Sequence, residues 1–468
     1  MPTRHRRRTG SGDTPVSRLA AFAVALLLAV FLGAGAAPLA VLAETPGSNS
    51  NPEPEAALAT GPTILGETVT FHGRGYGHGV GMSQYGARGR AQAGEDVATI
   101  LGHYYQGATL AALDPTTQIR VLVLSKWIAR VDRPLVVYGR LGSWSIDGVG
   151  GEFPADARLR LFPPEAPAPG MAVATGAPWR LIVEGADGMI WFDGLAPADF
   201  TIRGTTADTK LQLWSKPTRY DRYRGVLRVI VHSATRVSVV NDVMLEEYLG
   251  GVVPVEMPAT WPAAALQAQA IAARSYAARR LRPGVSYFDV PDNSSSQIYR
   301  GIVAERPATT AAIEATTGTV LMSGTTIVNA MFHSTGGGAT ESNENVYTSA
   351  TGRRTGRPVS YLRGALDRRP DGTPFDGGAP YATWMTRTYS RAQLSAWFAA
   401  DRRTNVGDLL AIDLRDRGIS GRLVSVTLFG TAGTRKVSGE VFRAVFNKRR
   451  PATDPILRST LLDTSPIP

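Results

Sequence analysis

Residues 252–277 read VVPVEMPATWPAAALQAQAIAARSYA, and this stretch decides the fold around it. Its second half predicts a helix over 263–281, because alanine and leucine, which favour helices, dominate that range. Pro262 suits a first helical turn, and Thr260 can cap it. A Pro-Gly pair at 283–284 ends the helix.

Glu256 lies in the first half of this stretch, between Pro254 and Pro258 and among valines and a methionine. Prolines on both sides predict an extended backbone that presents the glutamate side chain in one place. Apolar surroundings disfavour the charged form of a carboxyl, so its pKa rises and it can act as a general acid near neutral pH. The alternative is a surface glutamate or a cap of the following helix.

Upstream, residues 118–215 contain short β-branched and aromatic runs separated by Gly, Pro and Asp turns, which predicts an all-β module. Runs over 227–231 and 237–240 continue the strand pattern. Residues 244–250 then show a short helical pattern.

Downstream, residues 307–316 predict a helix and residues 353–378 a loop rich in Arg, Gly and Pro. A helix over 391–400, a hairpin over 423–437 and a helix over 439–446 follow. The fold class is therefore α+β.

The N-terminus indicates export. A basic segment over 4–8 precedes an uncharged apolar run over 19–43 that ends in small residues, as in a secretory signal peptide. An uncleaved membrane anchor is the alternative, since the run is long enough to span a bilayer. Residues 44–62 are rich in Pro, Ser and Asn and predict a linker. We expect a secreted or cell-wall protein that contacts a membrane only if this segment is retained.

The composition excludes several classes of protein. The chain has 468 residues, no cysteine and six histidines, so disulfides and thiol catalysis are excluded and a His-rich metal centre is not expected. The net charge of +11 favours anionic surfaces such as cell-wall polymers. Arginine is spread along the chain rather than clustered, so nucleic acid is not an expected partner.

Residues 63–112 hold a glycine-rich motif and a helix that we expect to pack on the core. Residues 73–86 lack the spacing of dinucleotide-binding and phosphate-binding loops. Glycine permits positive φ and close approach of the backbone to a ligand. The polar residues on this segment therefore predict one wall of a cleft, and a tight structural turn is the alternative; they are His78, Ser83, Gln84 and Tyr85.

Three further polar groups are candidates for the site. His333 and Ser334 end a predicted strand, where neighbouring side chains point to opposite faces, so a positioning role is more plausible than a nucleophile–base pair. Residues 292–299 form a polar loop. Glu246 and Glu247 indicate a solvated helix face, or a second carboxylate if one of them meets Glu256.

Taken together, these strings resemble the stage II sporulation protein D family (SpoIID/LytB). The likeness is specific over about 225–345 and looser over 380–462. The strings that carry it are 241–258, 261–262, 265–277, 296–299, 332–337, 420–443 and the GHGVGMSQYGA string at 77–87.

The resemblance implies a catalytic core over 225–462 and a lytic transglycosylase that cuts peptidoglycan glycan strands, especially strands without stem peptides. Glu256 matches the family's catalytic glutamate. A single acid/base suffices when the substrate's own 6-hydroxyl attacks C1. The expected substrate-binding residues are His78, Ser83, Gln84, Tyr85, Gln267, Arg274, Ser296, Gln297, Tyr299, His333 and Ser334.

Two departures from the family pattern matter. Some relatives resemble zinc proteins with a cysteine just after the His-Ser string, whereas this chain has Gly336 and Gly337 there, so no metal or other cofactor is expected. The glycine-rich string follows the catalytic region in many relatives but precedes it here, as in a circular permutation. We therefore expect residues 72–86 to fold back beside Glu256.

Two other functions remain open. The chain could be a non-catalytic peptidoglycan-binding protein that stimulates a cell-wall amidase, as the LytB part of the family name suggests. It could also be a conventional two-carboxylate muramidase or glucosaminidase. The expected partner is the glycan strand in each case, with an amidase as an additional partner in the first.

Overall fold

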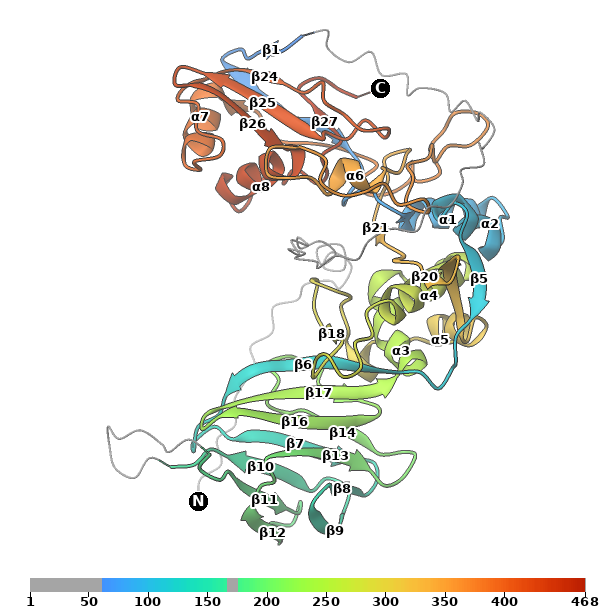
Figure 1. The fold of residues 1–468 in the computed structure, drawn as a ribbon, viewed down its shortest axis with the longest axis vertical. Helices are drawn as coiled ribbons and strands as arrows, with labels where there is room; N and C mark the ends of the chain where they lie inside the picture. The colour runs from blue at the N-terminus through green and yellow to red at the C-terminus, as the bar shows by residue number, and fades with distance from the viewer. Residues whose placement is uncertain (1–60, 166–175, 468) are drawn as a thin grey trace, which may run out of the picture.

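The computed structural model describes residues 61–165 and 176–467. The proposed signal or anchor, and the linker except for residues 61–62, lie outside the described residues. Figure 1 shows an elongated molecule with β-sheets at one end, helices in the middle and a second sheet with helices at the other end. The α+β fold class is confirmed. No helix within the described ranges is long and apolar enough to cross a membrane.

The β-rich end contains two sheets. The described strands of the first run in the order β18 (Val290–Pro291), β6 (Gln118–Ile128), β17 (Arg236–Met244), β16 (Val226–Ser233), β13 (Asp199–Gly204), β8 (Trp144–Ile146) and β9 (Val149–Phe153). Those of the second run in the order β12 (Ile190–Leu195), β11 (Arg180–Glu184), β10 (Arg158–Phe162), β7 (Leu135–Arg140), β14 (Lys210–Gln212) and β15 (Arg222–Tyr223). β7 and β10 bury every second residue, as half-buried strands do.

The β-rich part extends past residue 215, as the strand pattern over 227–231 and 237–240 predicted. β16 and β17 belong to its first sheet, so the sheet continues to Met244, directly before the helix that ends at Glu256. Tyr248 and Val252 belong to the same hydrophobic cluster as Val121 and Val239. The module therefore shares its core with the helix that carries Glu256.

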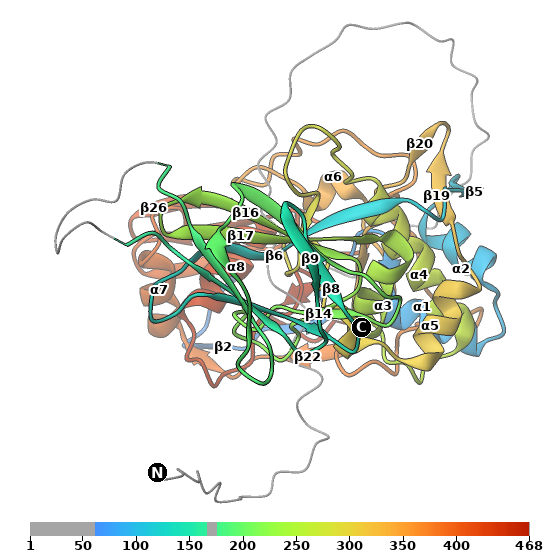
Figure 2. The ribbon, with the colours of Figure 1, turned by 90° about the horizontal axis from the view of Figure 1, so that it is seen from below.

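The middle layer is helical. It contains α1 (Gln84–Gln92), α2 (Val97–Tyr104), α3 (Leu245–Glu256), α4 (Ala263–Ala278), the 3-10 helix η1 (Gly301–Ala304) and α5 (Pro307–Glu314), with the small sheet β5 (Thr109–Ala112), β19 (Thr319–Ser323) and β20 (Thr326–Ile327). α4 is buried along most of its length and packs against α1, α2, α3 and α5. Seen from below, α1 to α5 lie together on one side of the molecule (Figure 2).

Two local expectations were wrong. Helix α3 runs to Glu256 and includes Pro254, so the backbone before Glu256 is helical rather than extended. Burial of Leu249, Val252 and Val253 outweighs the hydrogen bond that the proline removes. Helix α4 begins after Pro262 without a side-chain cap, so Thr260 does not cap it.

The far end is built from both ends of the chain. Its main sheet has the order β1 (Thr63–Ile64), β24 (Leu409–Asp413), β25 (Ser425–Gly430) and β26 (Gly433–Ser438), with α7 (Arg391–Ala399) and α8 (Gly439–Arg449). The early strands β2 (Thr68–Val69) and β3 (His72–Arg74) pair with late ones, namely β23 (Tyr389–Ser390), β22 (Thr383–Met385) and β27 (Leu462–Asp463). The predicted closing helices and hairpin are confirmed.

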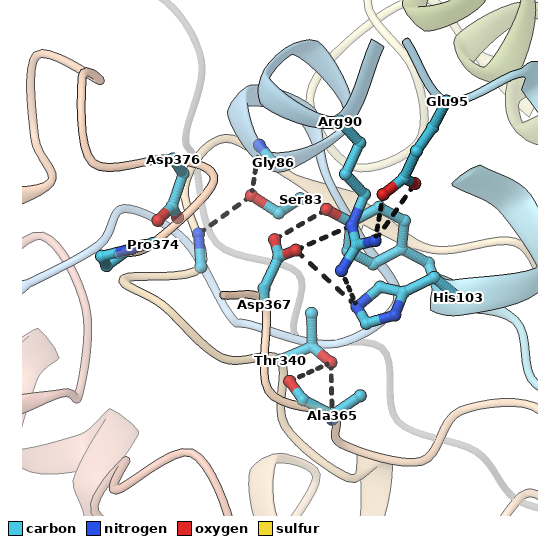
Figure 3. Close-up of polar contacts among 12 residues, drawn as sticks. Ser83, Gly86, Arg90, Glu95, His103, Thr340, Ala365, Asp367, Pro374 and Asp376 are labelled. Atoms are coloured by element: carbon cyan, nitrogen blue, oxygen red, sulfur yellow. Dashed lines mark hydrogen bonds and ion pairs between the residues drawn. The ribbon is translucent and has the colours of Figure 1, made fainter. Parts of the chain in front are cut away.

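A buried ionic network holds the loop over 353–378 against α1 and α2 (Figure 3). Arg90 Nε donates to Asp367 Oδ1 at 2.9 Å, and the Tyr104 hydroxyl donates to Asp367 Oδ2 at 2.7 Å. Glu95 pairs with Arg90 at 3.0 Å. Gly86 leaves room for this network, since a Cβ there would lie 2.1 Å from Asp367 Oδ2.

We expect Asp367→Ala to destabilise the protein by about 3 kcal/mol, because it leaves a buried guanidinium with only one carboxylate partner. Asp208, which is exposed, provides the control: Asp208→Ala should change stability by less than about 0.5 kcal/mol. Urea unfolding of both variants and the parent measures the effect. Equal stability of the two variants would show that the network does not hold this loop.

Candidate functional site

Glu256 is fixed at the C-terminal end of α3. Its neighbours Val253 and Met257 are buried, and they anchor this end of the helix. The Glu256 side chain keeps partial exposure, so the carboxyl is close to the surface while protein surrounds it. A helix end anchored in this way presents the carboxyl in a defined position.

Burial raises the pKa of the Glu256 carboxyl to about 7, while hydrogen bonds from the Gln84 side chain and the Ile298 backbone act in the opposite direction. Gln84 Nε2 lies 3.4 Å from Glu256 Oε2 and 3.4 Å from Gln269 Oε1, which makes both contacts weak. The raised pKa that the sequence predicted is therefore present, and its cause is burial.

The glycine-rich segment reaches Glu256, as expected. β4 (Met82–Ser83) pairs in parallel with β21 (Phe332–His333), and α1 starts at Gln84 beside Glu256. Gly77 has φ 109°, and a Cβ there would lie 2.9 Å from the His333 Cβ. The glycines thus allow close approach to other parts of the protein rather than to a ligand.

Ser83 has a structural role instead of the expected role in substrate binding. It is fully buried, and its hydroxyl accepts hydrogen bonds from the backbone N–H groups of Gly86 and Gly336, both at 3.1 Å. It caps α1 and ties the 336–337 loop to it (Figure 3). The next residue, Gln84, is the one that faces the carboxyl.

His78 and His333 lie together, with ring centroids 5.4 Å apart. Burial and the nearby Arg422 guanidinium lower the pKa of His78 to about 4, and burial with the neighbouring His78 lowers the pKa of His333 well below its usual range. Both rings are therefore neutral at neutral pH. His333 Nδ1 lies 3.3 Å from the Val80 carbonyl, and its buried Nε2 has no partner among the described residues.

A second group surrounds Glu256 from the side of α3 and α4. The Tyr248 hydroxyl donates to Gln297 Oε1 at 3.2 Å, and the charge of Glu256 contributes to the raised pKa values of Tyr248 and Tyr276. The Tyr276 hydroxyl and Ser296 Oγ are both buried, and a contact between these two side chains acts against the raised pKa of Tyr276.

Three of the expected substrate-binding residues lie elsewhere. Arg274 is fully buried and makes a bidentate ion pair with Glu246, at 2.8 and 2.7 Å. Tyr299 is buried and donates to Asn241 Oδ1 at 2.9 Å. Gln267 lies two residues before Gln269 on α4, so the two side chains leave the helix roughly 200° apart. Since Gln269 meets Gln84, Gln267 points away from it. Periodicity shows that these two glutamines face different ways, but it cannot show which one meets Glu256.

The Arg274 pair also bears on the carboxylates before Glu256. Glu246 is not part of a solvated helix face, since it also accepts the Gly318 N–H at 3.1 Å, and Glu247 is exposed. Neither residue is among the groups that shift the pKa of Glu256. The geometry therefore gives no support to a second carboxylate from this helix.

Tyr85 and Ser334 lie at the edge of the site. The Tyr85 ring packs edge-on against Trp261 at 4.7 Å, and Arg88 lies over the same indole at 5.5 Å. The Tyr85 N–H donates to the Ser334 carbonyl at 3.0 Å, while Ser334 Oγ lies 3.3 Å from the Thr335 hydroxyl. Trp261, which was not selected as a site residue from the sequence, belongs to this aromatic edge.

Among residues 61–165 and 176–467, no group of three or more His, Asp or Glu side chains could hold a metal ion. His78 and His333 form only a pair. The site therefore consists of one carboxyl of raised pKa, neutral imidazoles, amides and hydroxyls.

Comparison with known proteins shows a family similarity over part of the chain. Residues 233–322 match the model of the SpoIID family, described as stage II sporulation protein. This segment includes Glu256 and helices α3 and α4. The match is confined to this segment, and it supports the resemblance to the SpoIID family and a role related to the cell wall.

Similar proteins match over limited lengths. An uncharacterized protein of Brachyspira hyodysenteriae is 33% identical over 144 residues, which is 30% of this chain and 37% of that protein. The amidase enhancer of Bacillus subtilis is 58% identical over 43 residues, 9% of this chain and 6% of that protein. Stage II sporulation protein D of Bacillus amyloliquefaciens is 45% identical over 65 residues, 14% and 17% respectively. The chain thus spans well under half of the length of each.

The pKa of Glu256 predicts a pH effect on stability. Between its ordinary value of 4.5 and about 7, the folded protein binds this proton more tightly than the unfolded chain, so stability falls as the pH rises through that window. The free energy of unfolding of Glu256→Gln, relative to that of the parent, should therefore rise by up to about 3 kcal/mol as the pH increases from 5 to 8. Unfolding at both pH values measures this. A difference that does not change with pH would contradict it, and Glu247→Gln is the matched control.

Proposed function

We propose that the protein cleaves peptidoglycan glycan strands as a lytic transglycosylase, with Glu256 as the acid and base. The observation that carries this proposal is the buried Glu256 carboxyl with a pKa of about 7. At neutral pH a large share of such a carboxyl holds its proton and the rest is ionised, so it can both give and take a proton. The match of residues 233–322 to the SpoIID family model supports the choice of substrate.

The proposed reaction needs one carboxyl. Glu256 protonates the glycosidic oxygen as the bond from C1 of the muramic residue breaks. The carboxylate then takes the proton of that residue's own 6-hydroxyl as its oxygen bonds to C1. The products are an anhydro-muramic end and a free hydroxyl on the leaving sugar, and no water is consumed. The pKa of Glu256 is set by burial, an amide side chain and a backbone N–H rather than by a second acid, which agrees with this scheme.

The other site residues act on binding and position. Gln84 donates to the carboxyl and keeps its pKa from rising further. The Tyr276 and Ser296 hydroxyls and the neutral His333 ring are buried polar groups. We assign them to positioning the groups around Glu256.

An amidase-enhancing function is the second candidate, favoured by the 58% identity over 43 residues to the Bacillus subtilis amidase enhancer. In that case the protein would bind the glycan without cutting it, and a cell-wall amidase would be the partner. For both functions we propose an extracytoplasmic location, secreted or anchored, because the basic and apolar N-terminus has the features of an export signal.

Glu256→Gln should lower glycan cleavage at least about 100-fold, the usual contribution of a general acid–base residue. Glu247→Gln, an exposed carboxylate on the same helix, should retain parental activity. The assay is release of anhydro-muramic ends from denuded and intact peptidoglycan, detected by mass spectrometry. Reducing ends would indicate a two-carboxylate hydrolase. Stimulation of an amidase without cleavage would indicate the enhancer, and activity that survives Glu256→Gln would remove the assignment.

Gln84→Leu should move the basic limb of the pH–rate profile upward by about half a pH unit, because a hydrogen bond to the charged form of Glu256 is lost. Gln92→Leu, at the exposed far end of the same helix, should leave the profile unchanged. A lower rate at every pH without a shift of the limb would show that Gln84 acts only through folding.

A further inference from the structure

A hollow in the β-rich module lies apart from Glu256. It is formed where the turn between β14 and β15 faces η1, and its volume is about 560 Å³. Its lining includes Gln212, Trp214, Lys216, Arg219, Arg222 and Val303. This volume is in the range of small-molecule sites, so the hollow can take a sugar unit.

Trp214 is the main apolar surface of the hollow. Its side chain is 58% exposed, although the Tyr138 ring packs against it at 5.9 Å. An indole held from one side with its remaining surface open is suited to stack on the apolar face of a sugar ring. Trp191 is comparably exposed, at 48%, but does not line the hollow.

The charge of the hollow is positive. Arg219 and Arg222 are exposed and have no ion pair with a described carboxylate. Arg219 donates to the Tyr220 hydroxyl at 2.8 Å, and Arg300 stacks on the Tyr220 ring at 4.8 Å. The acidic lining residue, Asp221, is buried and accepts a hydrogen bond from Gln212 at 2.8 Å. Guanidinium groups in this setting are suited to bind a carboxylate.

The floor of the hollow is connected to the catalytic site. Lys216 is buried and pairs with Asp292, and it donates to the Tyr223 hydroxyl at 2.6 Å. Asp292 begins the loop over 292–299, whose Ile298 N–H faces Glu256. A glycan strand bound at Trp214 would therefore lie beside Lys216, whose ion pair with Asp292 leads to the loop that faces Glu256.

We propose that this hollow is an accessory glycan subsite, in which Trp214 stacks on a sugar ring and Arg222 and Arg219 bind its carboxylate. The inference rests on the proposed function and specifies its substrate. A muramic residue without a stem peptide carries a free lactyl carboxylate, and a substituted one does not.

Co-sedimentation with insoluble denuded peptidoglycan tests this, using the full-length chain in a Glu256→Gln background so that cleavage does not interfere. Trp214→Ala should weaken binding by about tenfold, the effect of losing a central aromatic contact. Arg222→Gln should weaken it several-fold. The matched control Trp191→Ala should stay within about twofold of the parent, and circular dichroism should show that all three variants fold.

A second arm tests the ligand chemistry. Reducing the lactyl carboxylates of the glycan to alcohols should weaken parental binding as much as Arg222→Gln does, and Arg222→Gln should cause no further loss on the reduced glycan. Equal binding of Trp214→Ala and Trp191→Ala would overturn the subsite, even if the parent cleaves glycan. Trp214-dependent binding by a protein that never cleaves glycan would retain the subsite and reject the transglycosylase.

Discussion

The site depends on the enclosure of one carboxyl. Helix α3 is anchored by Val253 and Met257, and this places Glu256 where Gln84 and the Ile298 N–H meet it. Enclosure by protein disfavours the ionised form, and the two hydrogen bonds only partly compensate. The pKa of about 7 is the balance between these effects.

Segments far apart in the sequence supply this enclosure. Gln84 comes from the N-terminal part of the chain, and the β4–β21 pairing and the Arg90–Asp367 pair fix its position. The strands over 63–74 complete the sheets of the far end, which otherwise use residues after 382. An early segment can serve a later core in this way because pairing depends on proximity in space, as in a circular permutation.

The β-rich module has a role in this arrangement beyond its own stability. Its core is continuous with α3, so β6 and β17 support the helix that carries Glu256. The Lys216–Asp292 pair connects the module to the loop over 292–299 as well. A module attached in this way is held at a defined position relative to Glu256, which a flexibly linked domain is not.

The sequence by itself determined the helix predicted over 263–281, which the structure forms over 263–278, and the strand-rich character of 118–215 with its continuation over 227–240. It also determined the closing helices and Glu256 as the unusual carboxyl, because these features follow from local composition and periodicity. It could not determine which polar residues face Glu256. Ser83, Arg274 and Tyr299 satisfy buried groups elsewhere, and Gln269 rather than Gln267 meets Gln84. Tertiary packing alone decided these partners, and it also kept α3 helical through Pro254, since burial outweighs local preference.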